Sequence, residues 1–406
     1  MGARVTRGLL AIGVSVGACA EPAPLADADS PSALWRAAIQ RTEAKLFASE
    51  FASSSPAARR ATEEFLAGLI GSSWQLAETA SLLDEPIFTS NDGIVGLPGL
   101  FNPDNAYETA LLDPRGSYRI TGRRGTHLQL LLQVLDGYPL IVLGQSRLVI
   151  DVDALGVAPG QDFELFLGGA ERAGHWFPLA EDARTLVVRM TFADWAAETP
   201  SELRIERLDD TIDAPPGSRF ARAAEYLEQT TELWTGAFML RMKLVPVNEL
   251  RAPAPTRDGL VGQFSVLARF ELAPDEALLI TSPVSAAKYQ GIQLGDPWFA
   301  TPDWARRQVS LNRTQAYADA DGKLRYVISA SDPGVPNWLD TAGFASGYVF
   351  MRWQGLAAPL GETDAPGAEL VKLGELREKL PPDTPRLDAA ARARQLAARR
   401  LTPMRK

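Results

Sequence analysis

The chain is poor in the residues that staple small proteins or bind metals. Among its 406 residues there is one cysteine, Cys19, and there are two histidines, His127 and His175. One cysteine excludes an internal disulfide framework, so stability has to come from packing. Two histidines leave little room for a multi-histidine zinc centre. We therefore expect no structural metal, and we expect an ordinary hydrophobic core.

Several functional signatures are also missing. The chain has no glycine-rich nucleotide loop and no G-x-S-x-G nucleophile elbow. Asp319-x-Asp321-Gly322 resembles the start of a calcium loop, but the later ligands are absent and a hairpin turn is the expected structure. The formal net charge of -9 argues against a nucleic-acid partner. These absences predict no cofactor, and they say nothing about the oligomeric state.

The N-terminus is typical of a secreted protein. Arg4 and Arg7 precede an apolar run that ends just before Cys19. This run is shorter than the roughly 20 residues that span a bilayer, so it fits a signal peptide. Val16-Gly17-Ala18-Cys19 resembles a bacterial lipoprotein box, which predicts a signal over residues 1–19, lipidation of Cys19, and an outer-membrane anchor facing the periplasm. Cleavage after Ala20, or myristoylation at Gly2, are the alternatives.

A short spacer followed by helices is expected after the N-terminal signal. Residues 20–30 are rich in proline, alanine and aspartate and predict a linker. Residues 31–84 predict a helical cap, because Ser30-Pro31 and Ser55-Pro56 each match an N-cap followed by a proline in the first helical position. Apolar residues at helical spacing within 65–74 predict one buried face.

Residues 85–212 change to a β pattern. Short alternating runs recur about every ten residues without intervening helices, which favours an antiparallel β-sandwich over a parallel α/β sheet. The expected strands are 107–112, 117–121, 128–134, 147–152, 163–167, 185–192 and 203–208.

Residues 213–258 hold the most regular helical stripe and a linker. Six residues step by four and three positions along one face: Phe220, Ala224, Leu227, Thr231, Trp234 and Phe238. Such a stripe is typical of a helix packed in the core or between domains.

A second β-sandwich is expected over residues 259–356. Its strands are predicted from position 264 to 270 and over 278–281, 289–294, 314–318, 324–330 and 347–353. Residues 357–406 predict a linker and two helical runs, 368–380 and 387–400. Seven of the eight charged residues from Arg386 onwards are basic, which predicts a solvated tail that can contact anionic lipid.

Several segments together resemble a known family. They are Asn102-Pro103-Asp104-Asn105-Ala106-Tyr107, 113–122, 289–294, Ser310-Leu311-Asn312, Asp332-Pro333-Gly334 and Pro336-Asn337-Trp338-Leu339-Asp340. Over roughly residues 85–355 the chain resembles the bacterial domain-of-unknown-function family catalogued under number 1214, often found with family 1254. The resemblance implies antiparallel, jelly-roll-like β-sandwiches and implies no reaction.

Loop acids are the candidate catalytic groups. Asp332 and Asp340 lie beside Gly, Pro and Trp residues, where a dry pocket raises the pKa of a carboxyl group and lets it act as a general acid. Paired across a cleft, they would suit hydrolysis or elimination. The alternative is that such side chains satisfy backbone N–H groups in turns.

Aromatic and amide residues predict a binding site. Aromatic rings cover the apolar face of a sugar or terpenoid, while amides and acids meet its hydroxyl groups. The candidate ligand-binding residues are Asp296, Trp298, Asn312, Gln315, Asn337 and Trp338, with a wall from Asn105, Tyr107 and Arg119. Tryptophan in a sandwich is often core instead. The cluster Arg115, Arg119, Arg123 and Arg124 favours structural ion pairs with Asp104 or Asp113, with Arg119 facing inward, and binding of an anionic substrate is the alternative.

The sequence thus predicts a mainly β protein with two antiparallel β-sandwich units, an N-terminal helical cap and a linking helix. The favoured function is an envelope lipoprotein that binds a saccharide or oxygenated small molecule in a cleft of the second sandwich. A hydrolase or lyase using Asp332 and Asp340, and a structural envelope module, remain open.

Overall fold

A computed structural model describes residues 30–90, 95–138, 140–141, 144–209, 217–256 and 260–401. The predicted signal peptide, Cys19, most of the spacer and the last five residues of the tail lie outside this part. No helix within the described ranges is long and apolar enough to cross a membrane.

The N-terminal helices begin where the serine–proline pairs predict. Ser30 Oγ accepts a hydrogen bond from Ala33 N, and Ser55 Oγ accepts one from Ala58 N. Each cap satisfies a backbone donor that the first helical turn cannot satisfy itself. The helices are α1 (Pro31–Phe47), a short α2 (Glu50–Ser54) that the sequence did not predict, and α3 (Pro56–Thr79).

The first sandwich packs a five-stranded sheet, in the order β1-β2-β8-β4-β5, on a four-stranded sheet, in the order β7-β6-β3-β9. The predicted strands are confirmed to within two residues, while the short β1 and β7 were not predicted. The strands are β1 (Thr89–Ser90), β2 (Asn105–Leu111), β3 (Ser117–Arg123), β4 (Gln129–Leu135), β5 (Ser146–Asp151), β6 (Asp162–Gly168), β7 (His175–Phe177), β8 (Thr185–Thr191) and β9 (Glu202–Arg207).

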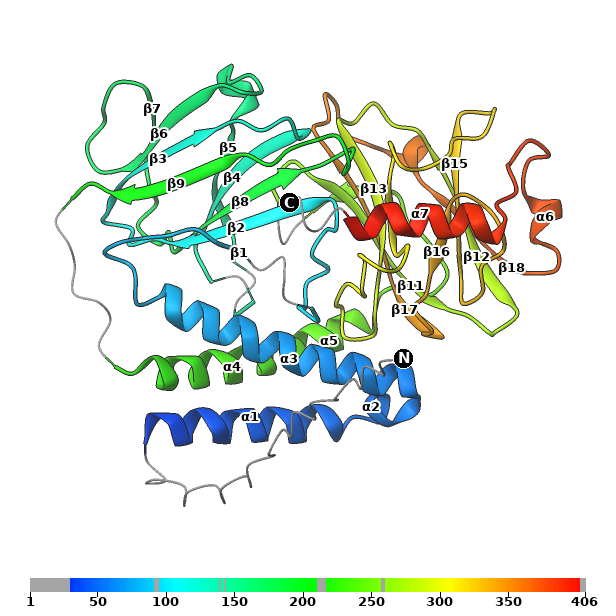
Figure 1. Cartoon of the computed structure of the whole chain (residues 1–406), viewed down its shortest axis with the longest axis horizontal. Helices are drawn as coiled ribbons and strands as arrows, with labels where there is room; N and C mark the ends of the chain where they lie inside the picture. The colour runs from blue at the N-terminus through cyan, green and yellow to red at the C-terminus, as the bar shows by residue number, and fades with distance from the viewer. Residues whose placement is uncertain are drawn as a thin grey trace, which may run out of the picture.

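The linking segment forms α4 (Arg219–Thr235) and α5 (Ala237–Met242). The stripe from Ala224 to Phe238 is buried, in a cluster shared with α1, α3 and the second sandwich, whereas Phe220 at its start is exposed. Helices α1, α3 and α4 form a layer beneath the two sandwiches, which lie side by side (Figure 1). The stripe therefore joins the helices to the β units.

The second sandwich packs sheet β10-β11-β17-β13-β14 on sheet β16-β15-β12-β18. Alternate residues of its strands, such as Val349, Met351 and Trp353, fill the core between the sheets. The strands are β10 (Ala254–Pro255), β11 (Phe264–Glu271), β12 (Glu276–Pro283), β13 (Tyr289–Gly295), β14 (Ser310–Asn312), β15 (Lys323–Ser329), β16 (Trp338–Asp340), β17 (Ser346–Gln354) and β18 (Gly367–Lys372).

Two secondary-structure predictions were wrong in this unit. Residues 314–318 are mainly a turn, because Asn312 Oδ1 accepts hydrogen bonds from Thr314 N and Gln315 N and ends the strand. Residues 368–380 are not one helix. They start with β18, which pairs with β12, and only α6 (Leu376–Lys379) is helical.

The two sandwiches repeat one topology. Strands β2, β8 and β4 correspond to β11, β17 and β13, and β3, β6, β7 and β9 correspond to β12, β15, β16 and β18. Both units even contain one parallel pair, β6 with β7 and β15 with β16. A pairing order this irregular, repeated in full, indicates an internal duplication.

The basic C-terminal segment is not a solvated tail, so that prediction was wrong. It forms α7 (Ala389–Leu401), which lies across the second sandwich (Figure 1). Arg392 and Arg399 are buried. The Arg399 guanidinium lies 4.6 Å from the ring centre of Trp195, in the first sandwich, and donates to Trp304 O and Ser310 O, in the second. Helix α7 therefore bridges the two sandwiches.

Candidate functional site

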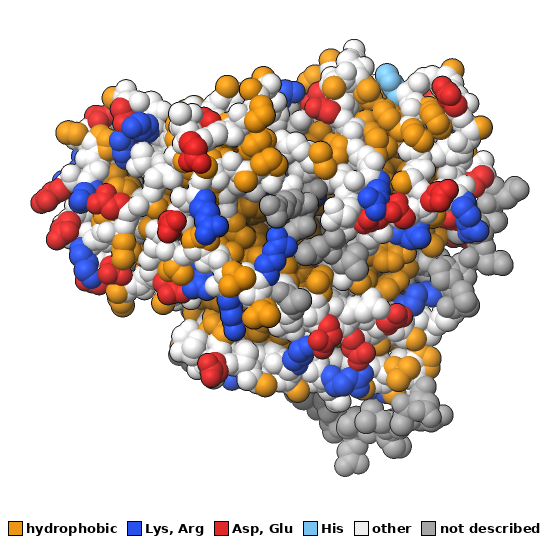
Figure 2. Space-filling model, turned by 180° about the vertical axis from the view of Figure 1, so that it is seen from behind, with side chains coloured by type: hydrophobic (Ala, Val, Ile, Leu, Met, Phe, Trp, Pro, Cys, Tyr) orange, Lys and Arg blue, Asp and Glu red, His pale blue; other side chains and the backbone are white. Residues whose placement is uncertain are grey.

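A cavity of about 170 Å³ lies between the two sandwiches. Its walls come from the outer faces of the two five-stranded sheets, through β2, β4 and β8 on one side and β17 on the other, and from residues 99–102, Thr256, Leu260 and Gln263. Figure 2 shows hydrophobic side chains gathered near the middle of the molecule's back face, between the sandwiches. The cavity is therefore a product of how the two repeated units meet.

Strand alternation places the wall residues. In β8, Val188 and Met190 point into the sandwich core, so Val187 and Arg189 point out. In β17, Val349 and Met351 fill the core, so Phe350, Arg352 and Gln354 face the cavity. The alternation of inward and outward side chains along each strand can be read from the sequence. The surface against which the outward side chains pack cannot.

Arg352 lies deep in this cavity wall and is only 7% exposed. Its Nη2 donates to Leu100 O at 2.6 Å, its Nη1 donates to Gln293 Oε1, and the guanidinium stacks 3.9 Å from the centre of the Phe350 ring. Burial lowers the pKa of Arg352, and the nearby charge of Arg189 lowers it further. No carboxylate of the described residues forms an ion pair with it.

Arg189 stands on the opposite sheet. Its Nε donates to Gln133 Oε1 at 3.2 Å, and its guanidinium lies 5.3 Å from the centre of the Tyr107 ring. Within the described part of the chain it has no ion pair either. The duplication relates the two arginines, because Arg189 lies opposite Leu131 of β4 and Arg352 lies opposite the equivalent Gly291 of β13. Two equivalent Arg–Gln pairs thus flank one cavity.

Two amide oxygens at the cavity are left without a partner. Asn105 Oδ1 and Gln354 Oε1 are buried and accept no hydrogen bond from any described residue. The nitrogens of the same amides are used, since Asn105 Nδ2 donates to Tyr107 Oη and Gln354 Nε2 donates to Gln263 Oε1. A buried acceptor without a donor is costly, and a bound molecule with hydroxyl or N–H groups would satisfy both.

A buried polar junction lies beside the cavity and joins the sandwiches. Asp104 is 1% exposed and accepts hydrogen bonds from Trp195 Nε1, Asn312 Nδ2 and Tyr289 Oη at 2.7, 3.0 and 2.7 Å. Tyr289 Oη is also bonded to Asn102, which lines the cavity. Burial raises the pKa of Tyr289 well above its ordinary value. This junction holds the two sheets in a fixed relation.

Only two of the predicted binding residues line the cavity, namely Asn105 and Tyr107. Asn312 belongs to the junction with Asp104, and Gln315 Oε1 accepts from Asn312 N. Both therefore act in the structure next to the site and do not face the space itself.

Asp296 and Trp298 anchor the helical layer. Trp298 is buried, its indole stacks 5.0 Å from the Phe65 ring of α3, and its Nε1 donates to Thr62 Oγ1. Asp296 Oδ1 accepts from Trp298 N and Ala300 N, and burial raises the pKa of Asp296 to about 7. Both residues therefore belong to the protein core, which for Trp298 is the alternative to a binding role.

Asp332 and Asp340 do not line the cavity between the sandwiches. Asp332 pairs with Arg392 at 2.8 Å and accepts from Gly334 N. Asp340 pairs with Arg307 at 2.7 Å and accepts from Ala342 N. Asn337 bonds both backbone groups of Tyr317, and Trp338 Nε1 donates to Ser329 O. All four side chains are therefore occupied within the protein, and the contacts of Asp332 and Asp340 with the backbone two residues later are those that turn chemistry predicts.

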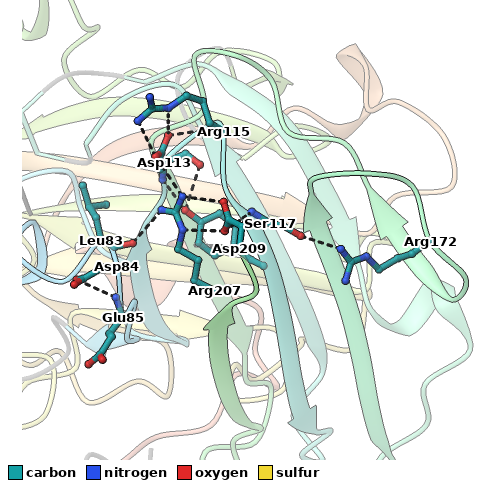
Figure 3. Close-up of polar contacts among 10 residues, drawn as sticks. Leu83, Asp84, Glu85, Asp113, Arg115, Ser117, Arg172, Arg207 and Asp209 are labelled. Atoms are coloured by element: carbon teal, nitrogen blue, oxygen red, sulfur yellow. Dashed lines mark hydrogen bonds and ion pairs between the residues drawn. The ribbon is translucent and has the colours of Figure 1, made fainter. Parts of the chain in front are cut away.

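The arginine cluster forms structural ion pairs. The prediction that Arg119 faces inward was wrong. Its side chain lies on the outer surface with Glu206 and Glu164, because its neighbours Tyr118 and Ile120 point into the core. Arg115 pairs with Asp113, which also meets the buried Arg207 (Figure 3). This network closes the end of the first sandwich.

No group of three potential metal-binding side chains occurs among the residues the structure describes. His127 is buried, with ring nitrogens 3.0 Å from Gln129 O and 2.8 Å from Ser201 Oγ. Burial lowers the pKa of His127 to about 3, so the ring is neutral and structural.

The fold and site define a class: two duplicated antiparallel β-sandwiches on a helical layer, with a polar cavity between them. A solved structure of an uncharacterised protein from Burkholderia cenocepacia is similar, with 29% identity, a TM-score of 0.73, and coverage of 85% of this chain and 97% of that one. A protein from Vibrio parahaemolyticus is more distant, with 11% identity, a TM-score of 0.43 and coverage of 84% and 98%. The first likeness supports the fold. No family model and no curated protein matches the chain, so the resemblance to family 1214 stays a prediction.

Proposed function

We propose that this protein binds a small oxygenated molecule in the cavity between its two sandwiches. The observation that carries the proposal is the pair of buried, unpartnered amide oxygens, Asn105 Oδ1 and Gln354 Oε1, in a cavity of about 170 Å³. Natural binding sites combine apolar walls with a few converging polar groups, and this cavity has both.

The size of the cavity limits the size of the ligand that it can hold. An engineered cavity of about 150 Å³ holds one benzene ring, whereas pockets for larger ligands have about 300 Å³ or more. The apolar side of the space comes from Phe101, Leu135, Val187 and Leu260. A single ring or a short branched chain with hydroxyl or carbonyl groups fits this space, and a saccharide chain does not.

The protein acts, in this proposal, in the bacterial envelope, with the membrane reached through lipidated Cys19. The support is the lipoprotein-like sequence around Cys19, which lies outside the described residues. No observation favours a hydrolase or lyase, because Asp332 and Asp340 are each paired with an arginine.

Ligand binding is tested with the full-length protein, purified in detergent. Small oxygenated ring compounds and monosaccharides are screened by thermal shift, and hits are titrated calorimetrically. Gln354→Met removes one unpartnered oxygen and should abolish the response, while Gln229→Met on the exposed side of α4 should keep it. The proposal fails if no compound raises the melting temperature, or if both variants respond alike.

The anchor is tested separately in cells with an alkyne-tagged fatty acid. We expect label on the wild-type protein and none on Cys19→Ala. Label retained by the variant would exclude lipidation at this position.

A further inference from the structure

The two cavity arginines differ from the other arginines of this protein that are paired with an acid. Arg124 and Arg392 are buried, Arg207 and Arg325 are half-buried, and each of the four is paired with at least one aspartate. Arg352 is equally buried, yet neither it nor Arg189 has an ion-pair partner within the described ranges. Arg399 also lacks an acid, but it is satisfied by carbonyl oxygens and a tryptophan ring and lines no described cavity.

Placing two guanidinium groups together without an acid is unfavourable. Each charge loses hydration on burial, and the two charges repel one another. Both costs act on Arg352, because burial and the charge of Arg189 lower the pKa of its guanidinium. An anion between the two arginines would remove both costs.

The arginines are also held ready for such an anion. Phe350 supports the Arg352 guanidinium, Tyr107 supports that of Arg189, and Gln293 and Gln133 each fix one nitrogen. Arg189 uses only Nε among the described residues, which leaves both of its Nη groups to donate. The planar fork of guanidinium groups suits the two oxygens of a carboxylate.

We infer that the ligand of this cavity is a small monocarboxylate, with its carboxylate held between Arg189 and Arg352 and its apolar body against the Leu135 and Val187 wall. The inference rests on the proposed function and specifies its ligand class. The unpartnered oxygens of Asn105 and Gln354 then accept hydrogen bonds from hydroxyl groups on the body of the acid. A carboxylate is favoured over a larger phosphate ester because the cavity has room for one ring.

The test compares acids with amides of nearly the same shape. Acetate, isobutyrate and benzoate are titrated into the full-length protein beside acetamide, isobutyramide and benzamide, with phenyl phosphate as a further probe. A charge-assisted hydrogen bond predicts that the preferred acid binds at least about tenfold more tightly than its amide. Arg189→Gln should abolish this preference, and Arg184→Gln, just before β8 and outside the cavity wall, should keep it.

The outcomes separate the two proposals. If the amides bind as well as the acids, or if Arg189→Gln keeps the preference, the carboxylate inference is overturned while small-molecule binding stands. Tighter binding of phenyl phosphate also overturns it. Binding by none of these probes overturns the carboxylate inference, and the broader screen with Gln354→Met still decides the proposed function. Arg189 is half-buried, so its variant is expected to fold, and circular dichroism checks this.

Discussion

Arg189 of β8 and Arg352 of β17 occupy equivalent positions in the two duplicated sandwiches, and both line the cavity between them. Each donates to an equivalent glutamine, Gln133 or Gln293, on the neighbouring strand. The duplication therefore affects the candidate site as well as the fold. It brought two copies of one cationic group to a shared boundary.

The junction around Asp104 is expected to hold the sandwiches together. Asp104→Ala removes three buried hydrogen bonds that come from Trp195, Asn312 and Tyr289. We expect the free energy of unfolding to fall by about 3 kcal/mol, measured by urea denaturation. Glu181→Ala on the exposed surface should change it by less than about 0.5 kcal/mol. Equal stability of the two variants would argue against the junction.

Asp296 should make stability depend on pH. Its pKa is raised by burial from 3.8 to about 7 in the folded state, so the folded protein binds a proton that the unfolded chain releases. The contribution of this protonated carboxyl group to the free energy of unfolding is complete below pH 3.8 and is lost as the pH rises to about 7. Asp296→Asn keeps the Oδ1 acceptor without the charge, so at pH 8 we expect it to be more stable than wild type by about 4 kcal/mol.

The measurement for Asp296→Asn is chemical denaturation at a series of pH values. Asp162→Asn, an exposed substitution, serves as the control. A constant difference between Asp296→Asn and wild type from pH 4 to pH 8 would show that this carboxyl group is not shifted.

Trp298 should be the main anchor of the helical layer. Trp298→Ala leaves a void against Phe65 and removes the hydrogen bond to Thr62, so we expect a loss of about 3–5 kcal/mol. Hydrogen exchange should accelerate in α3 before it does in β4. The half-buried Trp176→Ala in β7 should cost less and leave α3 protected. Unchanged protection of α3 in Trp298→Ala would contradict this role.

Arg399 should fasten α7 across both sandwiches. Arg399→Met loses the contact with Trp195 and the bonds to Trp304 and Ser310, for a cost of about 2 kcal/mol. We expect faster hydrogen exchange throughout α7. Arg394→Met on the exposed face of the same helix is the matched control. If both variants exchange alike, α7 is not held by Arg399.

Part of the architecture was predictable because it depends on local chemistry. The alternation in 185–192 and 347–353 predicted β8 and β17, and the serine–proline pairs predicted the starts of α1 and α3. The duplication also left a trace, since Ile120-Thr121, Gln133 and Asp136 recur as Ile280-Thr281, Gln293 and Asp296 at a constant offset. Comparing the two β regions would have found it.

The candidate site was less predictable. Loop acids beside tryptophans suggested a site at Asp332 and Asp340, but Arg392, far along the chain, neutralises one of them. The basic run from Arg386 predicted a solvated tail, yet Arg399 is buried by a ring of the first sandwich. In both cases the deciding partner is distant in sequence, and charge composition alone cannot show it.

The sequence by itself determined which residues alternate, which serines cap helices and which helical face is apolar. These properties depend on spacing and on backbone hydrogen bonding within a few residues. Only the tertiary structure decided that the outer faces of β8 and β17 meet, and that Arg189 and Arg352 share a cavity. That choice depends on how the two sheets pack, through contacts such as that of Asp104 with Tyr289, which join residues far apart in the chain.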